Sequence, residues 1–267
     1  MPVSKIITVT TWNELREALD FRKDKHTDRF RSNFVFRGVA VENYNLEPSI
    51  QRIGRLASEV ESHLIRSFKK YAPLNTLLDN YDNIWNWLAL AQHHGLPTRL
   101  LDWTFSADIA LHFLTESRDR FETDGAIWMV DCVKLHDYLP GVLKRHLDDE
   151  NVSTFSSDDL DKVIGSSLND IHKLKDNAMV FFEPPSISDR IVSQYGLFSF
   201  MLDVDSSNYE WLKQHPSLWR KIIIPKELKW EIRDRLDQAN ITERVIYPGL
   251  DGLSKWLARW YSNKNMH

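Results

Sequence analysis

Two patterns of apolar and polar positions alternate along the chain. Apolar residues that alternate with polar ones, or that run together over about four to eight positions, are typical of strands, and apolar residues three or four positions apart are typical of helices. Strands are predicted over residues 5–10, 33–39, 98–103, 125–130, 179–182, 197–201 and 219–224. Helices are predicted over residues 11–21, 56–71, 82–94, 106–114, 210–215, 226–239 and 250–261.

These elements do not follow the regular strand–helix–strand alternation of a doubly wound sheet. They predict an α+β domain with a central mixed or antiparallel sheet of short strands flanked by helices. The continuously apolar run GAIWMV at 125–130 is expected to be a central strand. Residues 153–176 are polar, with one helical pattern of apolar residues over 160–171, and are interpreted as a surface insertion or a lid. The chain has no convincing linker, although residues 148–161 are the best candidate.

The segment 85–115 places many polar groups that can do chemistry between two core-forming helices. Asp82 is a candidate N-cap for the first helix, and Gly95 and Pro97 are expected to end it at His93 and His94. The rest of the chain is therefore interpreted as a frame around this segment.

Arg99 and Asp102 lie among leucines in the strand predicted over 98–103. A buried arginine or aspartate is costly unless it is paired and hydrogen-bonded. Because the two residues are three positions apart, they point to opposite faces of an ideal strand. Two separate partners are therefore expected.

Arg37 is the second candidate for chemistry, near the end of the strand predicted over 33–39. It directly precedes Gly38, and a glycine in a strand lets a backbone or a ligand approach closely. Such an arginine can form a bidentate contact with a phosphate or a carboxylate. The alternative is an arginine that pairs with a neighbouring acid at a sheet edge.

Composition and charge narrow the classes of function. A hydrophobic share of 42% with ten tryptophans indicates a packed core. A net charge of −4 indicates no overall preference for nucleic acid or anionic membranes. The single Cys132 excludes an internal disulfide and is interpreted as a buried, unreactive thiol. With no leader-like or membrane-spanning segment, these features predict a cytoplasmic protein without membrane contact.

The common phosphate-binding and hydrolase motifs are missing: the sequence has no P-loop, no dinucleotide glycine fingerprint and no Gly-x-Ser-x-Gly. His93 and His94 are adjacent, so they project about 100° apart on a helix and cannot ligate a metal jointly; no metal site is expected. One of them either packs at the helix end or donates to a ligand. Trp103 is expected in the core, and Thr104 or Ser106 is expected to cap the next helix.

Three segments together resemble the FRG domain family, which is named for its Phe-Arg-Gly motif. They are Phe36-Arg37-Gly38, the run QHHGLPTRLLDWT at 92–104 and the run RIVSQYGLF at 190–198. The resemblance implies a single domain over residues 1–267, with a core at about 34–202 and a C-terminal strand and helices at 203–267. It also implies a bacterial or phage setting, where some members lie near toxin or defence genes.

A more distant resemblance is to ADP-ribosyltransferases of the Arg-Ser-Glu type. In those enzymes an aromatic-Arg-Gly triplet, a Ser-Thr-Ser-like motif and a glutamate follow one another along the chain. Residues 36–38 and the run DWTFS at 102–106 resemble the first two elements, whereas Gln194 stands near the place of the glutamate. An amide can hydrogen-bond a ribose hydroxyl but provides no negative charge for an oxocarbenium-like transition state. Asp102 or Glu183 would have to supply it.

This resemblance implies an NAD-using ADP-ribosyltransferase-like domain that serves as a toxin or an anti-phage defence effector. Arg37 would hold the phosphates or ribose of NAD, and Asp102 or Gln194 would contact the ribose as catalytic residues. The other cofactor-binding candidates are Phe36, Gly38, His93, His94, Arg99, Trp103, Thr104 and Ser106.

Two alternatives stay open. The first is a non-catalytic module that binds a nucleotide-like small molecule, a nucleic acid, or a target or regulatory protein. The second is purely structural: Arg37, Arg99 and Asp102 form one buried network that fixes the sheet. In the structural case Arg99→Ala would destabilise the protein by about 3–5 kcal/mol.

Overall fold

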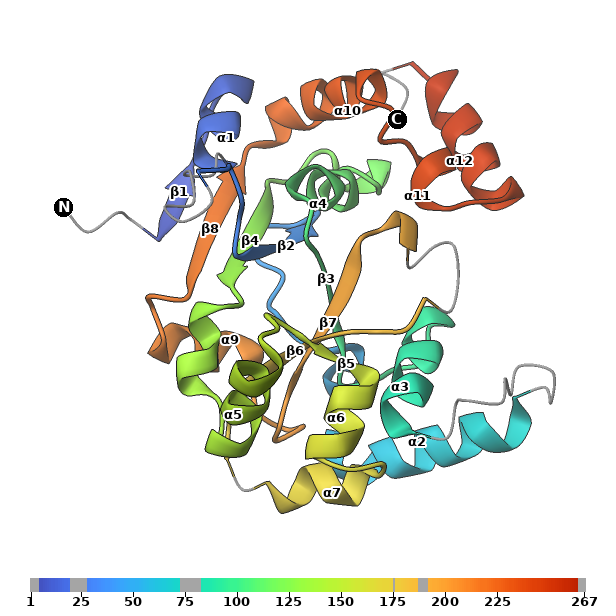
Figure 1. Ribbon diagram of the computed structural model, residues 1–267. Helices are drawn as coiled ribbons and strands as arrows, with labels where there is room; N and C mark the ends of the chain where they lie inside the picture. The colour runs from blue at the N-terminus through green and yellow to red at the C-terminus, as the bar shows by residue number, and fades with distance from the viewer. Residues whose placement is uncertain (1–4, 20–27, 73–82, 175, 187–191, 264–267) are drawn as a thin grey trace.

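The computed structural model describes residues 5–19, 28–72, 83–174, 176–186 and 192–263. Within these segments, eight strands form one mixed sheet in the order β1-β8-β4-β2-β3-β7-β6-β5 (Figure 1). Neighbouring strands are antiparallel except at the two edges, where β1 pairs with β8 and β5 pairs with β6 in parallel. The α+β prediction is therefore confirmed. The strands are β1 Ile6–Thr8, β2 Phe34–Val39, β3 Leu101–Thr104, β4 Gly125–Asp131, β5 Phe155–Ser156, β6 Met179–Glu183, β7 Gly196–Met201 and β8 Trp219–Ile224.

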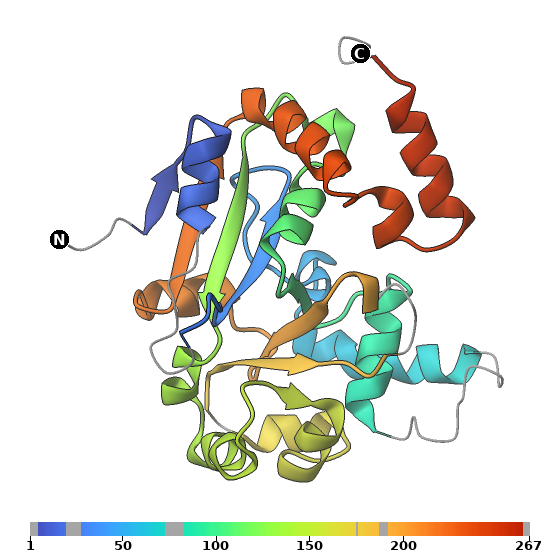
Figure 2. The same cartoon turned by 45° about the horizontal axis from the view of Figure 1, so that its top comes forward.

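Helices cover both faces of the sheet (Figures 1 and 2). On one face, α1, α4 and α10 pack on β2, β4 and β8 through Leu15, Leu111 and Ile232. On the other face, α3, α5, α6, α7 and α9 contribute to a second hydrophobic cluster. The helices are α1 Trp12–Leu19, α2 Ala57–Tyr71, α3 Ile84–His93, α4 Ala107–Leu114, α5 Gly141–Glu150, α6 Ser157–Val163, α7 Leu168–Lys173, α9 Asn208–Gln214, α10 Lys229–Gln238, α11 Glu243–Ile246 and α12 Leu250–Trp260.

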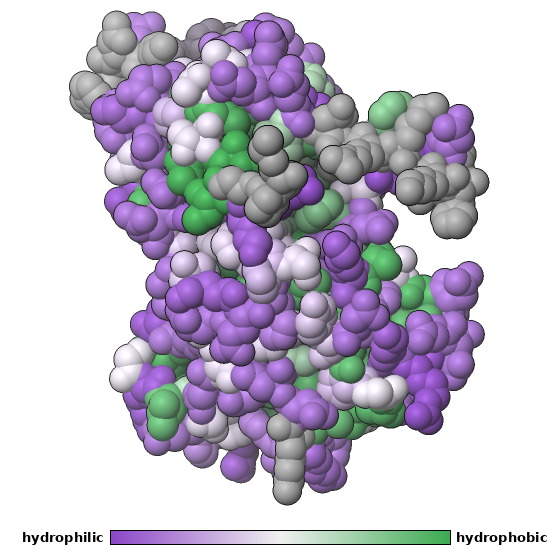
Figure 3. Space-filling model, turned by 90° about the vertical axis from the view of Figure 1, so that its left-hand side faces the viewer, coloured by the Kyte–Doolittle hydropathy of each residue, from purple (hydrophilic) through white to green (hydrophobic). Residues whose placement is uncertain are grey.

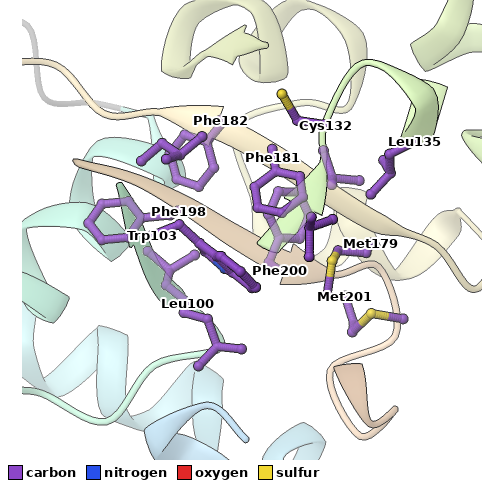
Figure 4. Close-up of a cluster of buried hydrophobic side chains, with 14 of the residues drawn as sticks. Leu100, Trp103, Cys132, Leu135, Met179, Phe181, Phe182, Phe198, Phe200 and Met201 are labelled. Atoms are coloured by element: carbon purple, nitrogen blue, oxygen red, sulfur yellow. The ribbon is translucent and has the colours of Figure 1, made fainter. Parts of the chain in front are cut away.

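Strands β3, β6 and β7 contribute aromatic side chains to the second cluster (Figure 4). Trp103 meets Phe181 edge to face, with 5.5 Å between the ring centroids. The indole Nε1 of Trp103 donates a hydrogen bond to Ser199 Oγ at 2.8 Å. A buried indole N–H needs such a partner, so the prediction that Trp103 belongs to the core is confirmed.

β3 begins later than the predicted strand over 98–103. The Thr98 hydroxyl accepts a hydrogen bond from the backbone N–H of Leu100 at 3.1 Å. The Thr98 N–H donates to Ser49 Oγ at 3.1 Å. These local bonds keep the residues before Leu101 in a turn and out of the strand ladder. Arg99 consequently lies in that turn and not in the strand.

Residues 153–176 complete the sheet edge. Phe155 and Ser156 pair with β6 as strand β5. Ser156 and Asp159 form a capping box that begins α6. Leu160 and Ile171 are fully buried in the second hydrophobic cluster. The lid alternative is therefore wrong, because a few apolar side chains anchor this polar segment in the core. Residues 148–161 include the end of α5, β5 and the start of α6, so the best linker candidate is part of the domain.

Local capping signals explain where the central helices begin and end. The predicted N-cap Asp82 lies outside the described residues, and Asn83 caps α3 by accepting from the Asn86 N–H at 2.8 Å. Gly95 follows the helix with φ +80°, the left-handed conformation expected of it. Ser106 caps α4 by accepting from the Ile109 N–H at 3.3 Å.

The β1 side of the molecule and the C-terminal helices differ in their exposed surfaces. The side of the molecule that carries the edge strand β1 is mostly hydrophilic, with a hydrophobic patch in its upper part (Figure 3). The C-terminal helix α12 follows α11 on the side of α4 (Figure 2). Two of its apolar side chains are open to water, with Leu250 79% and Trp260 55% exposed. None of the helices in the described segments has both the length and the apolar character needed to cross a bilayer.

Candidate functional site

At the centre of the sheet, β2 and β3 are paired over a much shorter length than β2 and β4. β2 pairs with β4 from Phe34 to Val39 but shares a single residue pair with β3, Phe36 with Thr104. Beyond that pair, β2 and β3 are joined by a side chain: Arg37 Nη1 donates a hydrogen bond to the backbone carbonyl oxygen of Asp102 at 2.6 Å. A cleft of about 320 Å³ opens at this point.

Seven of the predicted site residues line this cleft. Arg37, Asp102 and Gln194, the predicted catalytic residues, come together from β2, β3 and the turn before β7. Four of the predicted cofactor-binding residues join them: Phe36, Gly38, His93 and Trp103. The other four are not among its lining residues: His94, Arg99, Thr104 and Ser106.

The Phe-Arg-Gly triplet does three separate things. Phe36 is fully buried in the hydrophobic cluster on the α4 face. A Cβ at Gly38 would lie 1.8 Å from the carbonyl oxygen of Ala110, so only glycine allows α4 to pack against β2 here. Arg37 lies between them and points to the opposite face, as strand alternation requires. The triplet thus fixes α4 with its outer residues and directs one guanidinium to the cleft.

Arg37 is a constrained cation. Burial lowers the pKa of its guanidinium, the nearby charge of Arg52 lowers it further, and Asp102 opposes both effects. Its Nη1 lies 3.9 Å from Asp102 Oδ2. Its Nε is buried and has no hydrogen-bond partner among the described residues. A buried donor of this kind is satisfied when a ligand oxygen reaches it.

A hydrogen-bond chain within the motif at 92–104 orients Asp102. The Thr98 hydroxyl donates to Gln92 Oε1 at 2.6 Å, which turns the amide nitrogen of Gln92 towards Asp102. That nitrogen donates to Asp102 Oδ2 at 2.9 Å. The side chain of Asp102 is nevertheless 58% exposed, so the carboxylate is held in direction while remaining open to a ligand.

Thr104 and Ser106 act on the backbone. The Thr104 hydroxyl donates to the carbonyl oxygen of Gln194 at 2.8 Å and accepts from the Ser106 N–H at 3.1 Å. Tyr195 follows with φ +45°, so the turn before β7 is sharp. The side-chain Nε2 of Gln194 is buried without a partner among the described residues. Thr104 was expected to bind the cofactor, but it does not line the cleft. It holds the backbone of Gln194, and Gln194 lines the cleft.

Arg99 belongs to a different part of the molecule. Its Nε donates to Glu61 Oε1 at 2.6 Å, and its Nη2 donates to Glu61 Oε2. The two side chains are 1% and 2% exposed. This pair ties α2 to the turn before β3. The expectation of separate partners for Arg99 and Asp102 is confirmed, and the hypothesis of one network with Arg37 is wrong.

His93 and His94 take different positions at the end of α3. His93 lines the cleft, whereas His94 is the exposed C-cap residue of the helix. Their rings lie 5.1 Å apart in an edge-to-face arrangement. Among the residues that the structure describes, no group of three or more His, Cys, Asp or Glu side chains is placed to hold a metal ion.

Cys132 is placed as the sequence predicts. Its thiol donates to the carbonyl oxygen of Asn33 at 3.1 Å, and the residue is 5% exposed. Burial raises its pKa to about 12. Such a thiol stays protonated at neutral pH and is a poor nucleophile.

The sequence interpretation missed Glu116 and three aromatic residues. Glu116 lies just past the C-cap of α4 and lines the cleft, as do Phe113, Phe198 and Tyr247. An acidic residue at a helix C-terminus sits in an unfavourable field, and that local signal marks Glu116. Tyr247 follows α11 and carries no signal in the sequence, because only the folding of the C-terminal helices brings it here. Glu183, the other acid considered, accepts from Thr154 and is not a lining residue.

Residues 32–123 match the sequence model of the FRG domain family. Over these residues the chain is similar to FRG domains. The matched part contains the Phe-Arg-Gly triplet and the whole motif at 92–104, so most of the polar residues of the cleft belong to it. Gln194 and Tyr247 complete the cleft from beyond the matched residues. No curated protein and no solved structure was found to match the chain.

Proposed function

We propose that this cleft binds NAD and supports ADP-ribosyltransferase-like chemistry. The observation that supports this most is the convergence of Arg37, Asp102 and Gln194 on one cleft from three separate segments. These three residues provide a cation, an anion and an amide, the groups that a charged, hydroxyl-rich ligand needs. A toxin or anti-phage defence effector acting on a protein or nucleic-acid target is the wider role that this activity would serve.

The size and charge of the cleft suggest how the ligand would lie. A volume of about 320 Å³ is at the small end of ligand pockets, so it suits the nicotinamide riboside half of the dinucleotide. Arg37 and the nearby Arg52 form the positive end, which suits the diphosphate. Asp102 and Gln194 would bind the ribose hydroxyls, and Phe113 would face the nicotinamide ring.

The test is calorimetry with NAD and with ADP-ribose, together with an assay of nicotinamide release. Arg37→Lys keeps the charge but loses the planar fork and should weaken NAD binding at least about tenfold. Arg55→Lys is the matched control, because Arg55 is exposed and, in the described part of the chain, pairs with Glu59 at 3.5 Å. Wild-type protein that neither binds NAD at millimolar concentration nor releases nicotinamide would overturn the proposal.

A second candidate is a non-catalytic module that binds a nucleotide-like ligand, a nucleic acid or a partner protein. Two observations favour it: an amide, Gln194, stands near the expected place of the glutamate, and Asp102 already accepts a hydrogen bond from Gln92. Such a module would bind ADP-ribose and NAD equally well and release no nicotinamide. Release above the uncatalysed rate, lost in Arg37→Lys, would reject this candidate.

A further inference from the structure

We propose that Glu116 is the catalytic carboxylate of the cleft, an assignment that rests on the proposed NAD chemistry. Among the residues that the structure describes, Asp102 and Glu116 are the two carboxylates that line the cleft. They belong to different elements: Asp102 lies on β3, and Glu116 lies just after the end of α4. Their surroundings differ enough to assign them different roles.

Glu116 keeps its acceptor oxygens available. Its side chain is 28% exposed, and its Oε1 lies 3.7 Å from Lys255 Nζ of α12. That separation is beyond hydrogen-bonding distance, and the lysine is 59% exposed. Ion pairs so open to water are weak and screened by salt. Within the described part of the chain, no hydrogen bond to the carboxylate of Glu116 competes with a ligand.

The carboxylate of Asp102, unlike that of Glu116, already has two polar partners. Its Oδ2 accepts from Gln92 at 2.9 Å and lies 3.9 Å from the guanidinium of Arg37. The positive charge of Arg37 offsets part of its field, and 58% exposure lets water screen the rest. Asp102 is therefore suited to hold a ribose hydroxyl in place, and it is less suited to stabilise a developing cation.

The position of Glu116 in the fold strengthens its negative field. The C-terminus of α4 carries the negative end of the helix dipole, and Glu116 follows its C-cap residue Thr115 directly. The two negative sources add, and they face a cleft also lined by Phe113 and Tyr247. A charge arrangement that is fixed before the reaction and directed at a developing cation is the usual origin of electrostatic catalysis.

Cleavage of NAD at the nicotinamide–ribose bond passes through a positively charged stage that a negative group can stabilise. The bond between ribose C1′ and the nicotinamide nitrogen breaks, and its electron pair leaves with nicotinamide, which becomes neutral. Positive charge develops on C1′ and the ring oxygen, as in glycoside hydrolysis. A water molecule or a target hydroxyl then forms a bond to C1′ and loses its proton to solvent. Glu116 stabilises the positive charge between these events and is neither consumed nor modified.

The experiment compares Glu116→Gln and Asp102→Asn with Glu122→Gln as a control. Glu122 is exposed, pairs with Lys226 at 3.2 Å and lies outside the lining of the cleft. For each full-length variant we would measure NAD affinity by calorimetry, kcat and KM for nicotinamide release, and Tm. Glu116→Gln should keep NAD affinity within about threefold and Tm unchanged while kcat falls roughly 100-fold, as when one electrostatic contact to the transition state is removed. Asp102→Asn should act mainly on KM and affinity.

The outcomes separate this assignment from the proposed function. If the wild-type protein releases nicotinamide and Glu116→Gln keeps its kcat within about threefold, the assignment of Glu116 is wrong and NAD chemistry stands. If Asp102→Asn alone abolishes kcat at unchanged affinity, Asp102 takes the role. If the wild-type protein shows neither binding nor release, both proposals fall together. A lower kcat in Glu116→Gln with unchanged Tm, absent in Glu122→Gln, supports the assignment.

Discussion

Replacing Arg99 with alanine removes one half of an ion pair that water cannot reach. The guanidinium and the carboxylate of Glu61 are 1% and 2% exposed and share two hydrogen bonds. Without Arg99, the Glu61 charge stays buried with no counter-charge, and breaking such a pair costs about 3–5 kcal/mol. Against a total stability of about 5–15 kcal/mol for a typical domain, this is a large share.

Equilibrium unfolding in urea measures this cost. With a slope near 3 kcal/mol per molar for a chain of this size, the midpoint of Arg99→Ala should fall by roughly 1–2 M. The double variant Glu61→Leu/Arg99→Met removes both charges and fills similar space, so it should be far more stable than either single variant. Arg55→Ala, from the exposed pair with Glu59, is the control and should cost at most about 1 kcal/mol.

Two results would refute this account of the buried pair. One is a cost below about 1 kcal/mol for Arg99→Ala, and the other is a double variant as unstable as the sum of the two single ones. A folded double variant also tests whether Arg99 serves the ligand. Because Arg99 does not line the cleft, we expect NAD affinity to stay within about threefold of wild type.

Three further predictions concern acid stability, packing and orientation. Burial lowers the pKa of His112 to about 3, so as the pH falls His112 is protonated in the unfolded chain before it is protonated in the folded protein. From pH 7 to pH 4 this costs about 3 kcal/mol of unfolding free energy, and urea unfolding of His112→Gln should show a smaller loss. Gly38→Ala should destabilise the protein by about 1–3 kcal/mol or more by overpacking; an unchanged Tm would contradict the close contact with α4. Thr98→Val frees the amide of Gln92 and should weaken NAD binding several-fold by calorimetry, whereas unaltered affinity would show that the hydrogen-bond chain orients nothing important.

The sequence patterns predicted the bounds of helices and strands better than they predicted side-chain contacts. Strand β8 has the bounds that the apolar pattern predicts, and α3 ends at His93 as Gly95 and Pro97 require. β3 was placed three residues early, because a strand pattern does not reveal that the Thr98 side chain forms a turn with Leu100.

The candidate site shows the same division between local and distant information. Arg37, Asp102 and Gln194 were identified from the residue types and the motifs around them, and they do line one cleft. Arg99 was grouped with them because it lies in the same motif, although its partner Glu61 is on α2. Glu116 carries a local signal, an acid just past a helix C-terminus, but its place in the cleft depends on the packing of α4, which the sequence does not show.

The end of α3, the Ser106 cap of α4, the apolar strands and the motifs at 36–38 and 92–104 could all be read from the amino-acid sequence. These features depend on interactions within a few residues, and such contacts can be inferred from spacing alone. The packing of α4 on β2, the single pair between β2 and β3, and the arrival of Gln194 and Glu116 at one cleft were decided by the tertiary structure. They depend on which faces of distant elements meet, and that is set by the burial of the whole core rather than by any one segment.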